Sequence, residues 1–329
     1  MKRFIISITS ICLCFLVICA CTTMVSGKDL AREYYNLGNA YYEIKKYKEA
    51  IEFYQYAAQY DEYLYSAFFN MAYSYIALGD SQKGIDILET LLARDPKNTA
   101  IQGLIAYAYH AIDKDDEAIR VYTGILEMEK ENRDALFNLG VIYWKQKKYE
   151  EAEKNFRVLV DRNAADYPVV YNLGLLLGDM KKYTDAAKYL SQYLEAKPEN
   201  AKIYIDLAII FTALEEYNRA LEVYENAIAI DAKLSTAWFN RARILLSKVE
   251  DPDKGYTSLE QALDLGFNNR PEIQKLVEEM EASRLLESEK NRVRVLLKKK
   301  NLMPAAQPTP KPESITPSVS SEKPAGNKL

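Results

Sequence analysis

The chain has 329 residues, of which 49% are hydrophobic and 27% are charged, and this composition excludes a fully disordered protein. Its 43 basic and 47 acidic side chains give a formal net charge of −4, which argues against a nucleic-acid-binding protein. All four cysteines lie at or before Cys21, which excludes disulfide frameworks, Cys-based zinc sites and Cys nucleophiles from the rest of the chain.

Residues 1–20 have the pattern of a secretory signal peptide. Lys2 and Arg3 precede an apolar run without acidic residues that is short for a membrane span. The run ends in Ile18-Cys19-Ala20-Cys21, which resembles the lipobox of bacterial lipoproteins. The resemblance implies cleavage before Cys21 and acylation of that cysteine, with palmitate among the attached chains. Several acyl chains would anchor the protein, because each buried CH₂ contributes about 0.8 kcal/mol.

Two alternatives to lipidation remain at this end of the chain. Val25-Ser26-Gly27 has the small residues of an ordinary signal-peptidase site, and cleavage there would release a soluble protein that begins at Lys28. The segment can also stay uncleaved as an anchor. All three alternatives place the folded body outside the cytoplasm. We expect a lipoprotein of the bacterial cell envelope with a tether over residues 21–30. Thr22 favours the outer membrane facing the periplasm, under a sorting rule of some Gram-negative lipoproteins.

A helical pattern recurs every 34 residues over residues 31–269. Small residues (Gly or Ala) occupy position 8 of every repeat and position 20 of the first six, while bulky residues fill most of positions 4, 11 and 24. These positions form one stripe on each of two helices, so the pattern predicts one closely packed helix pair per repeat. The repeats begin at Ala31, Tyr65, Thr99, Arg133, Tyr167, Ala201 and Ser235.

This pattern resembles the tetratricopeptide repeat (TPR) family, and residues 31–42 nearly match its consensus. The resemblance implies an all-α fold, a right-handed TPR superhelix (α-solenoid) of seven helix-turn-helix repeats. One helix pair cannot bury both of its apolar stripes, so each repeat must pack on its neighbours and the stack needs a polar end. Residues 270–301 are expected to form the capping helix or helices. Residues 302–329 are rich in proline, which predicts a disordered tail.

The first helices of TPR superhelices face a concave groove, and the resemblance places eight aromatic side chains there. Tyr and Trp often anchor bound segments, so these residues predict a trough for an extended peptide or an amphipathic helix. The alternative interpretation is that they belong to the general consensus and only pack against neighbouring repeats. The candidates for the partner-binding groove are Tyr35, Tyr42, Phe69, Tyr73, Tyr107, Phe137, Trp144 and Tyr171.

Asparagine predominates at position 6 of the repeats. A carboxamide both donates and accepts hydrogen bonds, so a column of them can bind a peptide backbone whatever its sequence. The similar repeats of O-linked N-acetylglucosamine transferase use asparagine in this way, although Leu104 and Asp206 interrupt the column here. The candidates for this peptide-backbone ladder are Asn36, Asn70, Asn138, Asn172 and Asn240.

His110 is the single histidine and the strongest candidate for catalysis in the sequence. A general base needs an orienting partner, and the nearby Asp113, Asp115 and Asp116 begin the turn into the next helix, where aspartates commonly cap helices. The same segment lacks the glycine and the alternating ligands of an EF-hand. We therefore predict no enzyme activity, no metal site and no cofactor.

The sequence as a whole predicts a non-catalytic scaffold that binds other envelope or periplasmic proteins and no nucleic acid. The alternative is a ligand-binding or transporter-accessory lipoprotein of the periplasm, which a closed pocket rather than an open trough would favour. Self-association is a further hypothesis. So is occupation of the groove by the proline-rich tail, since extended segments suit aromatic grooves.

Overall fold

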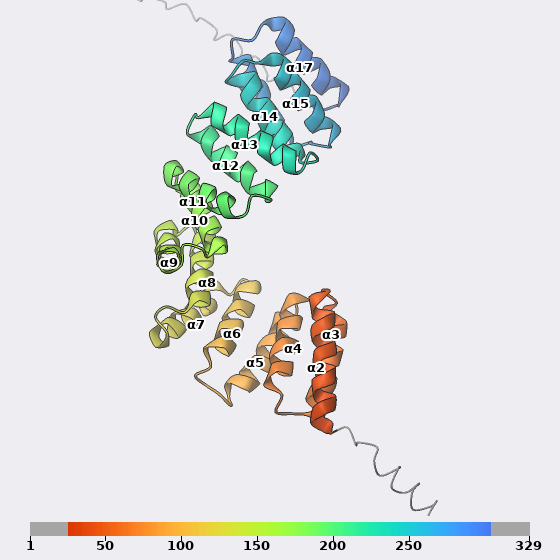
Figure 1. Cartoon of the computed structure of the whole chain (residues 1–329), viewed down its shortest axis with the longest axis vertical. Coiled ribbons are helices and arrows are strands. Elements are labelled where there is room, and N and C mark those ends of the chain that lie inside the picture. The colour runs from red at the N-terminus through yellow and green to blue at the C-terminus, as the bar shows by residue number, and fades with distance from the viewer. Residues whose placement is uncertain (1–25, 304–329) are drawn as a thin grey trace, which may run out of the picture. The chain divides into compact units, whose positions relative to one another are not determined.

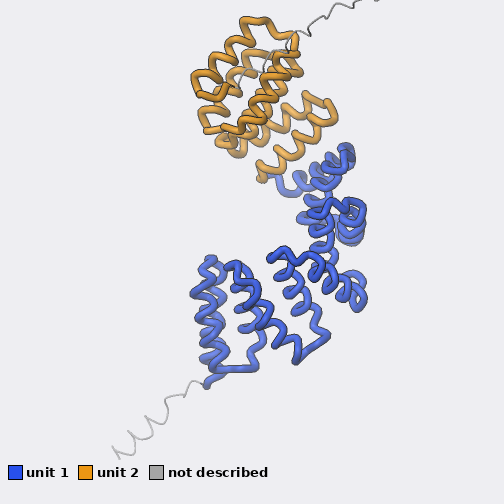
Figure 2. Tube along the Cα trace, turned by 180° about the vertical axis from the view of Figure 1, so that it is seen from behind, with its two compact units in different colours: residues 1–198 blue, residues 199–329 orange. Residues whose placement is uncertain are grey.

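The computed structural model describes residues 26–303, and within this range the chain contains sixteen α-helices and no strand (Figure 1). It divides into two compact units, with the boundary between Pro198 and Glu199 (Figure 2). The predicted signal peptide, the lipidation site Cys21 and the proline-rich residues 304–329 lie outside the described residues. The prediction of an all-α chain of helix-turn-helix repeats is confirmed.

The first unit contains five helix pairs, one for each of the first five sequence repeats. The first helices of the last four pairs begin at the first residue of their sequence repeat. The helices are α2 (Gly27–Glu43), α3 (Tyr47–Tyr60), α4 (Tyr65–Ala77), α5 (Ser81–Leu92), α6 (Thr99–Ala111), α7 (Asp115–Met128), α8 (Arg133–Lys145), α9 (Tyr149–Arg162), α10 (Tyr167–Asp179) and α11 (Tyr183–Ala196).

Close approach within each pair depends on the small residues at positions 8 and 20. A Cβ atom added at Gly140 would lie 2.6 Å from the ring of Phe156, and one at Gly38 would lie 2.5 Å from the ring of Tyr54. Both rings are fully buried. The glycines therefore set how near the two helix axes can lie, because a close-packed core has no space for an extra methyl group.

Neighbouring repeats share their hydrophobic cores. Ile85 and Leu88 of α5 pack between α4 and α6, against Ile76 of the same repeat and Ile105 of the next. Among the described residues, no helix packs on the N-terminal side of the first repeat. Leu37 is therefore 44% exposed, whereas the residues at its position in the next five repeats are buried. Each helix pair thus covers an apolar face that it cannot bury alone.

Helix α2 begins four residues before the first sequence repeat. The Ser26 hydroxyl accepts a hydrogen bond from the backbone N–H of Asp29 at 3.1 Å, and this cap starts the helix at Gly27. Residues 27–30, which the sequence assigned to the tether, are therefore helical. The first N–H groups of a helix have no partner within it, and the Ser26 hydroxyl satisfies that of Asp29. With this cap in place, α2 can extend beyond the repeat pattern.

A residue in the left-handed conformation closes the turn within each repeat. Glycine fills this place only at Gly79, where φ is +86°, while Lys45, Lys147 and Lys181 adopt φ of +60°. The left-handed region costs a residue that has a Cβ atom roughly 1–2 kcal/mol. The chain thus holds this unfavourable conformation in most of its repeats.

Replacement of Lys147 by glycine is therefore expected to stabilise the protein by about 1 kcal/mol, because glycine adopts a positive φ without that cost. Denaturant titration followed by circular dichroism measures the change. The matched control is Lys154→Gly at an exposed position within α9, which should destabilise by about 1 kcal/mol. If both substitutions changed the free energy of unfolding in the same direction, the left-handed conformation of Lys147 would be contradicted.

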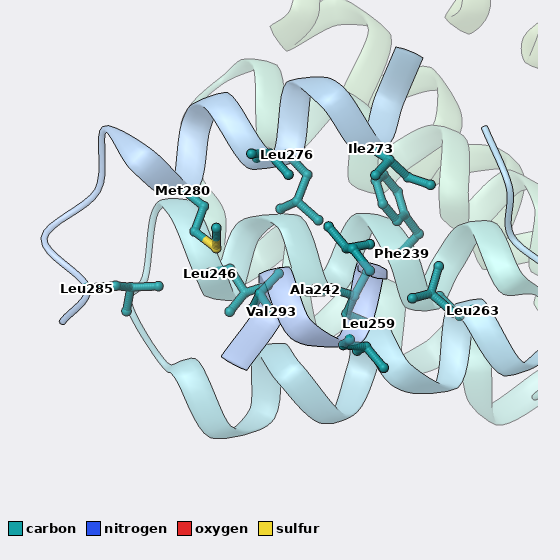
Figure 3. Close-up of a cluster of buried hydrophobic side chains, with 14 residues drawn as sticks. Phe239, Ala242, Leu246, Leu259, Leu263, Ile273, Leu276, Met280, Leu285 and Val293 are labelled. Carbon is teal, nitrogen blue, oxygen red and sulfur yellow. The ribbon is translucent and has the colours of Figure 1, made fainter. Parts of the chain in front are cut away.

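The second unit contains the last two sequence repeats and two further helices that cap them. The cap helices cover α14 and α15: Ile273, Leu276 and Met280 pack in one buried cluster with Phe239 and Leu246 (Figure 3). The helices are α12 (Ala201–Ala213), α13 (Tyr217–Ile230), α14 (Ser235–Ser247), α15 (Pro252–Asp264), α16 (Arg270–Glu281) and α17 (Glu287–Lys299).

The folded cap extends slightly beyond its predicted end at Asn301. Leu302 and Met303 are partly buried against the same cluster, and the backbone N–H of Leu302 donates to the carbonyl of Leu297 at 2.8 Å. The sequence assigned both residues to the proline-rich tail. Their apolar side chains explain the difference, because packing them on the cap removes them from water.

Candidate functional site

Four of the eight predicted groove aromatics meet around one hollow in the first unit. The hollow has a volume of about 460 Å³, is partly open to solvent and lies among α4, α6 and α8, with part of its wall from α7. We name it the Gly103 hollow. Its lining residues are Phe69, Tyr73, Thr99, Ala100, Gly103, Leu104, Tyr107, Tyr122, Asn132, Asp134, Ala135, Phe137 and Asn138.

The hollow exists because the third repeat has glycine where most other repeats have an aromatic residue. Position 5 holds Tyr35 in the first repeat and Phe137 in the fourth, and each ring packs on the buried aromatic ring of its own second helix, with centroids 5.9 and 5.8 Å apart. At Gly103 the nearest atom to an added Cβ is 3.9 Å away, on Ile125. The third repeat thus has unfilled space at this position.

Tyr122 of α7 forms a buried part of the same hollow. Its side chain is 1% exposed, and its hydroxyl has no hydrogen-bond partner among the described residues. The equivalent Tyr54 in the first repeat donates to Asn39 at 2.7 Å. Position 9 of the third repeat, equivalent to Asn39, is Tyr107. Burial, with the nearby Asp134 carboxylate, raises the pKa of Tyr122, so its hydroxyl stays neutral.

Three tyrosines from successive repeats form a continuous row beside the hollow. The ring of Tyr73 meets the edge of Tyr42 at a centroid distance of 5.7 Å and stacks on Tyr107 at 6.3 Å, with 13° between the planes. Burial and the neighbouring Tyr73 raise the pKa of Tyr42 to about 12. Tyr73 and Tyr107 are 37% and 40% exposed, so both present apolar surface to a ligand.

The other predicted groove aromatics contact groups of their own chain. The indole N–H of Trp144 donates to Asp179 of the next repeat at 2.7 Å, and the Tyr35 hydroxyl accepts from Asn70 at 3.2 Å. Tyr171 packs on the ring of Tyr193 with centroids 5.7 Å apart. Trp144 and Tyr35 therefore link neighbouring repeats, a role that the consensus interpretation also predicts.

The predicted asparagine ladder is only partly presented to a ligand. Asn70 donates to Asn39 at 2.9 Å, while Asn138 and Asn172 donate to backbone carbonyls of their own helices at 2.8 and 2.7 Å. Asn240 lies in the second unit and is buried. Asn36 is exposed on α2. The aromatic lining is thus better placed for binding than the amides.

A second hollow adjoins the first along the groove. It has a volume of about 570 Å³ and shares Phe69 and Ala100 with the Gly103 hollow. Tyr65, Asn70 and Leu91 line its other parts. Phe69 and Ala100 thus contribute to the walls of both hollows.

Comparisons with known proteins assign the fold family. Family models of the tetratricopeptide repeat match residues 41–107, 114–168 and 171–235, which together make up more than half of the chain. The chain belongs to the tetratricopeptide repeat family. TPR proteins are generally non-catalytic scaffolds that bind other proteins. No curated protein sequence shows a significant match to this one.

Solved structures share the TPR fold at low sequence identity. The C-terminal part of a TPR repeat-containing protein from Cytophaga hutchinsonii has a TM-score of 0.59 and 17% identity, over 75% of this chain and 99% of that one. A TPR protein from Parabacteroides merdae has a TM-score of 0.52 and 17% identity, over 77% and 99%. MamA has a TM-score of 0.47 and 21% identity, over 52% and 96%. At these identities, the structures with TM-scores of 0.59 and 0.52 show a common fold and nothing further.

His110 of this TPR protein belongs to an ion-pair network that joins the third and fourth repeats. Its Nδ1 atom lies 2.6 Å from Asp115, and Lys145 lies 2.7 Å from Asp113 and 3.2 Å from Asp115. Asp115 therefore does not cap α7 as the sequence suggested, because its carboxylate faces the side chains of His110 and Lys145. Burial opposes ionisation of Asp115, but hydrogen bonds from His110 and Lys145 prevail and lower its pKa.

Replacement of Asp115 by asparagine is expected to destabilise the TPR unit by about 1 kcal/mol at neutral pH, because it removes the charge from both contacts. Because the pKa of Asp115 is lowered in the folded protein, this stabilisation is fully present above the usual aspartate pKa. It is lost as the pH falls through the pKa of Asp115 in the folded state. The difference from wild type should thus shrink in acid. Thermal melts of both proteins across pH test this, with the exposed Asp116→Asn as the control. A difference that is constant with pH would contradict the network.

Two further properties of residues 26–303 bear on this TPR site. No cluster of three or more His, Cys, Asp or Glu side chains there could hold a metal ion. None of the helices in this range has both the length and the apolar character needed to cross a membrane.

Proposed function

We propose that this protein is a lipid-anchored scaffold of the bacterial cell envelope that holds segments of other envelope proteins in the groove of its first TPR unit. One observation carries the proposal: Phe69, Tyr73, Tyr107 and Phe137, from three successive repeats, line one hollow. Aromatic side chains held by rigid helices bind partners at low entropic cost, and they dominate the energetics of many interfaces.

The composition of the groove supports a segment of low net charge as its ligand. Basic residues of the first helices, such as Arg32 and Lys145, alternate with acidic ones such as Asp134 and Asp179. Arg133 also pairs with Asp134 at 3.1 Å and with Asp166 at 2.7 Å, so its charge is already compensated. A mixed surface of this kind does not favour a strongly charged partner.

The lipobox-like segment before Cys21 supports the membrane anchor. Ser26 adds a structural argument against the alternative cleavage after Gly27. That cleavage would remove the residue that caps α2 and the first residue of the helix, at a cost of about 1 kcal/mol. Cleavage before Cys21 leaves the capped helix intact. Thr22 supports an outer-membrane position facing the periplasm.

Affinity capture from envelope membranes tests the proposed function. The full-length protein is compared with a variant in which the four aromatic residues of the hollow, Phe69, Tyr73, Tyr107 and Phe137, are replaced by alanine. The matched control replaces three exposed tyrosines outside the hollow, Tyr56, Tyr60 and Tyr63, which are 47%, 46% and 70% exposed. We expect envelope proteins to be retained by wild type and control and lost with the groove variant, with circular dichroism confirming that it folds. Equal retention by all three would refute the proposal.

The Gly103 hollow is partly open, but its volume fits one alternative function, the binding of a small ligand for a membrane transporter. About 460 Å³ lies within the range of small-molecule sites. Native mass spectrometry of the protein purified from envelope membranes distinguishes the two functions. A small molecule that stays bound to wild type and is lost from the groove variant would favour the alternative.

A further inference from the structure

We propose that the Gly103 hollow takes a tyrosine side chain from the bound protein segment. Its ring would fill the place that Gly103 leaves empty, and its phenol would hydrogen-bond with the hydroxyl of Tyr122. The inference rests on the proposed function, and it specifies the chemistry of the partner at one point of the groove.

The shape of the hollow supports an aromatic ring as the occupant. In the first and fourth repeats, the ring at position 5 packs on the buried aromatic ring at position 24. Tyr122 is the position-24 residue of the third repeat, and Gly103 supplies no ring to cover it. A ring from the partner can therefore supply a contact that the first and fourth repeats make internally. The rings of Phe69 and Phe137 flank this place on either side, and aromatic pairs favour such offset or edge contacts.

The unpaired hydroxyl supports a polar group on that ring. The Tyr122 hydroxyl is buried and lacks a partner among the described residues, whereas the hydroxyl of the equivalent Tyr54 donates to Asn39. Buried polar groups without a hydrogen bond are uncommon in folded proteins and unfavourable. A ligand that brings a donor or acceptor into the hollow removes this penalty, which an apolar ligand of the same shape cannot do.

Among the side chains that carry such a group, tyrosine matches the lining best. A carboxylate would be repelled by Asp134, which lines the hollow and is exposed. A lysine ammonium would lose its hydration between Phe69 and Phe137 without a carboxylate on the buried side of the hollow. Tyrosine combines a ring for the apolar walls with a hydroxyl that both donates and accepts. It can therefore donate a hydrogen bond to the Tyr122 hydroxyl or accept one from it.

The premise of an unpaired hydroxyl has its own test. Tyr122→Phe removes a hydroxyl without a partner, so its melting temperature should equal or exceed that of wild type. Tyr54→Phe removes a hydroxyl that donates to Asn39, so its melting temperature should fall. A fall of the same size in both variants would overturn the inference, because it would show that Tyr122 is already hydrogen-bonded within the protein.

Peptide binding tests the inference directly. Isothermal titration of the full-length protein uses the peptide Gly-Ser-Ala-Tyr-Ala-Ser-Gly and its counterparts with Phe or Leu in place of Tyr. We expect wild type to bind the tyrosine peptide about tenfold more tightly than the phenylalanine peptide. Tyr122→Phe should abolish that preference, and Gly103→Phe should weaken both peptides by about tenfold or more. The control Gly124→Phe, at a position of α7 with no atom near an added Cβ, should keep the preference.

Failure of the inference can be told apart from failure of the proposed function. No preference for tyrosine, or a preference that persists in Tyr122→Phe, overturns the inference. Envelope proteins that are still captured by Gly103→Phe but lost with the groove variant would also overturn it, while the scaffold function stands. Loss of capture in both variants, together with the tyrosine preference, supports the inference.

Discussion

Replacement of Gly140 by alanine is expected to lower the free energy of unfolding by about 1–3 kcal/mol, although alanine forms helices better than glycine does. The added Cβ would lie 2.6 Å from the ring of Phe156, and that ring is fully buried and cannot swing into solvent. Either the ring must leave its rotamer or α8 and α9 must separate. Denaturant titration of the full-length protein measures the loss.

A double-mutant cycle shows whether the ring contact is the cause. Phe156→Leu should partly rescue Gly140→Ala, because the second repeat already combines alanine at position 8, Ala72, with leucine at position 24, Leu88. The coupling between the two substitutions should be about 0.5–3 kcal/mol. The control is Gly124→Ala, where open space surrounds the added Cβ and stability should stay equal or rise. Independent, additive effects would show that Phe156 does not limit the approach of the helices.

The sequence predicted this helix pairing well because its period is strong and local. The first helices of the second to seventh repeats start at the repeat starts read from the sequence, since each start depends on a short pattern of apolar and small residues. The start of α2 was missed by four residues. The residue that determines this start is Ser26, whose hydroxyl caps α2 at the N–H of Asp29 and lies outside the repeat pattern.

The left-handed turn residues were not predicted at all. Glycine is the usual sign of a positive φ, and most of the repeats carry Lys, Asp or Glu at this place instead. The repeated geometry of the two helices imposes the turn regardless of the residue. The sequence did hold one sign of this turn: Gly79 is the one glycine at position 15 of the aligned repeats.

The sequence named candidate site residues by their repeat position, but it could not give their contacts. Position 5 showed Gly103 among aromatics in the sequence, yet the significance of Tyr122 depends on an unpaired hydroxyl that only coordinates reveal. Trp144 was predicted as an anchor, but its indole N–H is bound by Asp179 from the next repeat. Asn240 was predicted with the other asparagines, but it is buried in the second unit. Contacts between repeats decide such cases, and the pattern within one repeat does not contain them.

Truncation after Asn269 is expected to destabilise the second unit by at least about 4 kcal/mol and to make the protein aggregate. The cap helices α16 and α17 cover Phe239, Leu246 and Leu259, which are at most 1% exposed. Exposure of each such side chain costs about 1.5–3 kcal/mol. Hydrogen exchange of full-length and truncated protein measures the effect: amides of α14 and α15 should lose protection, while those of α4 in the first unit should keep it.

Two matched variants separate loss of the cap from loss of chain length. Truncation after Met303 removes only residues 304–329 and keeps Leu302 and Met303 on the buried cluster, so the protection of α14 should not change. Leu276→Ala keeps the whole chain and should cost about 2–5 kcal/mol, because this side chain is fully buried in the same cluster. If α14 amides stayed protected after truncation at Asn269, the last repeat would be stable without its cap. The solenoid would then need no polar end, contrary to the nearest-neighbour coupling expected for stacked repeats.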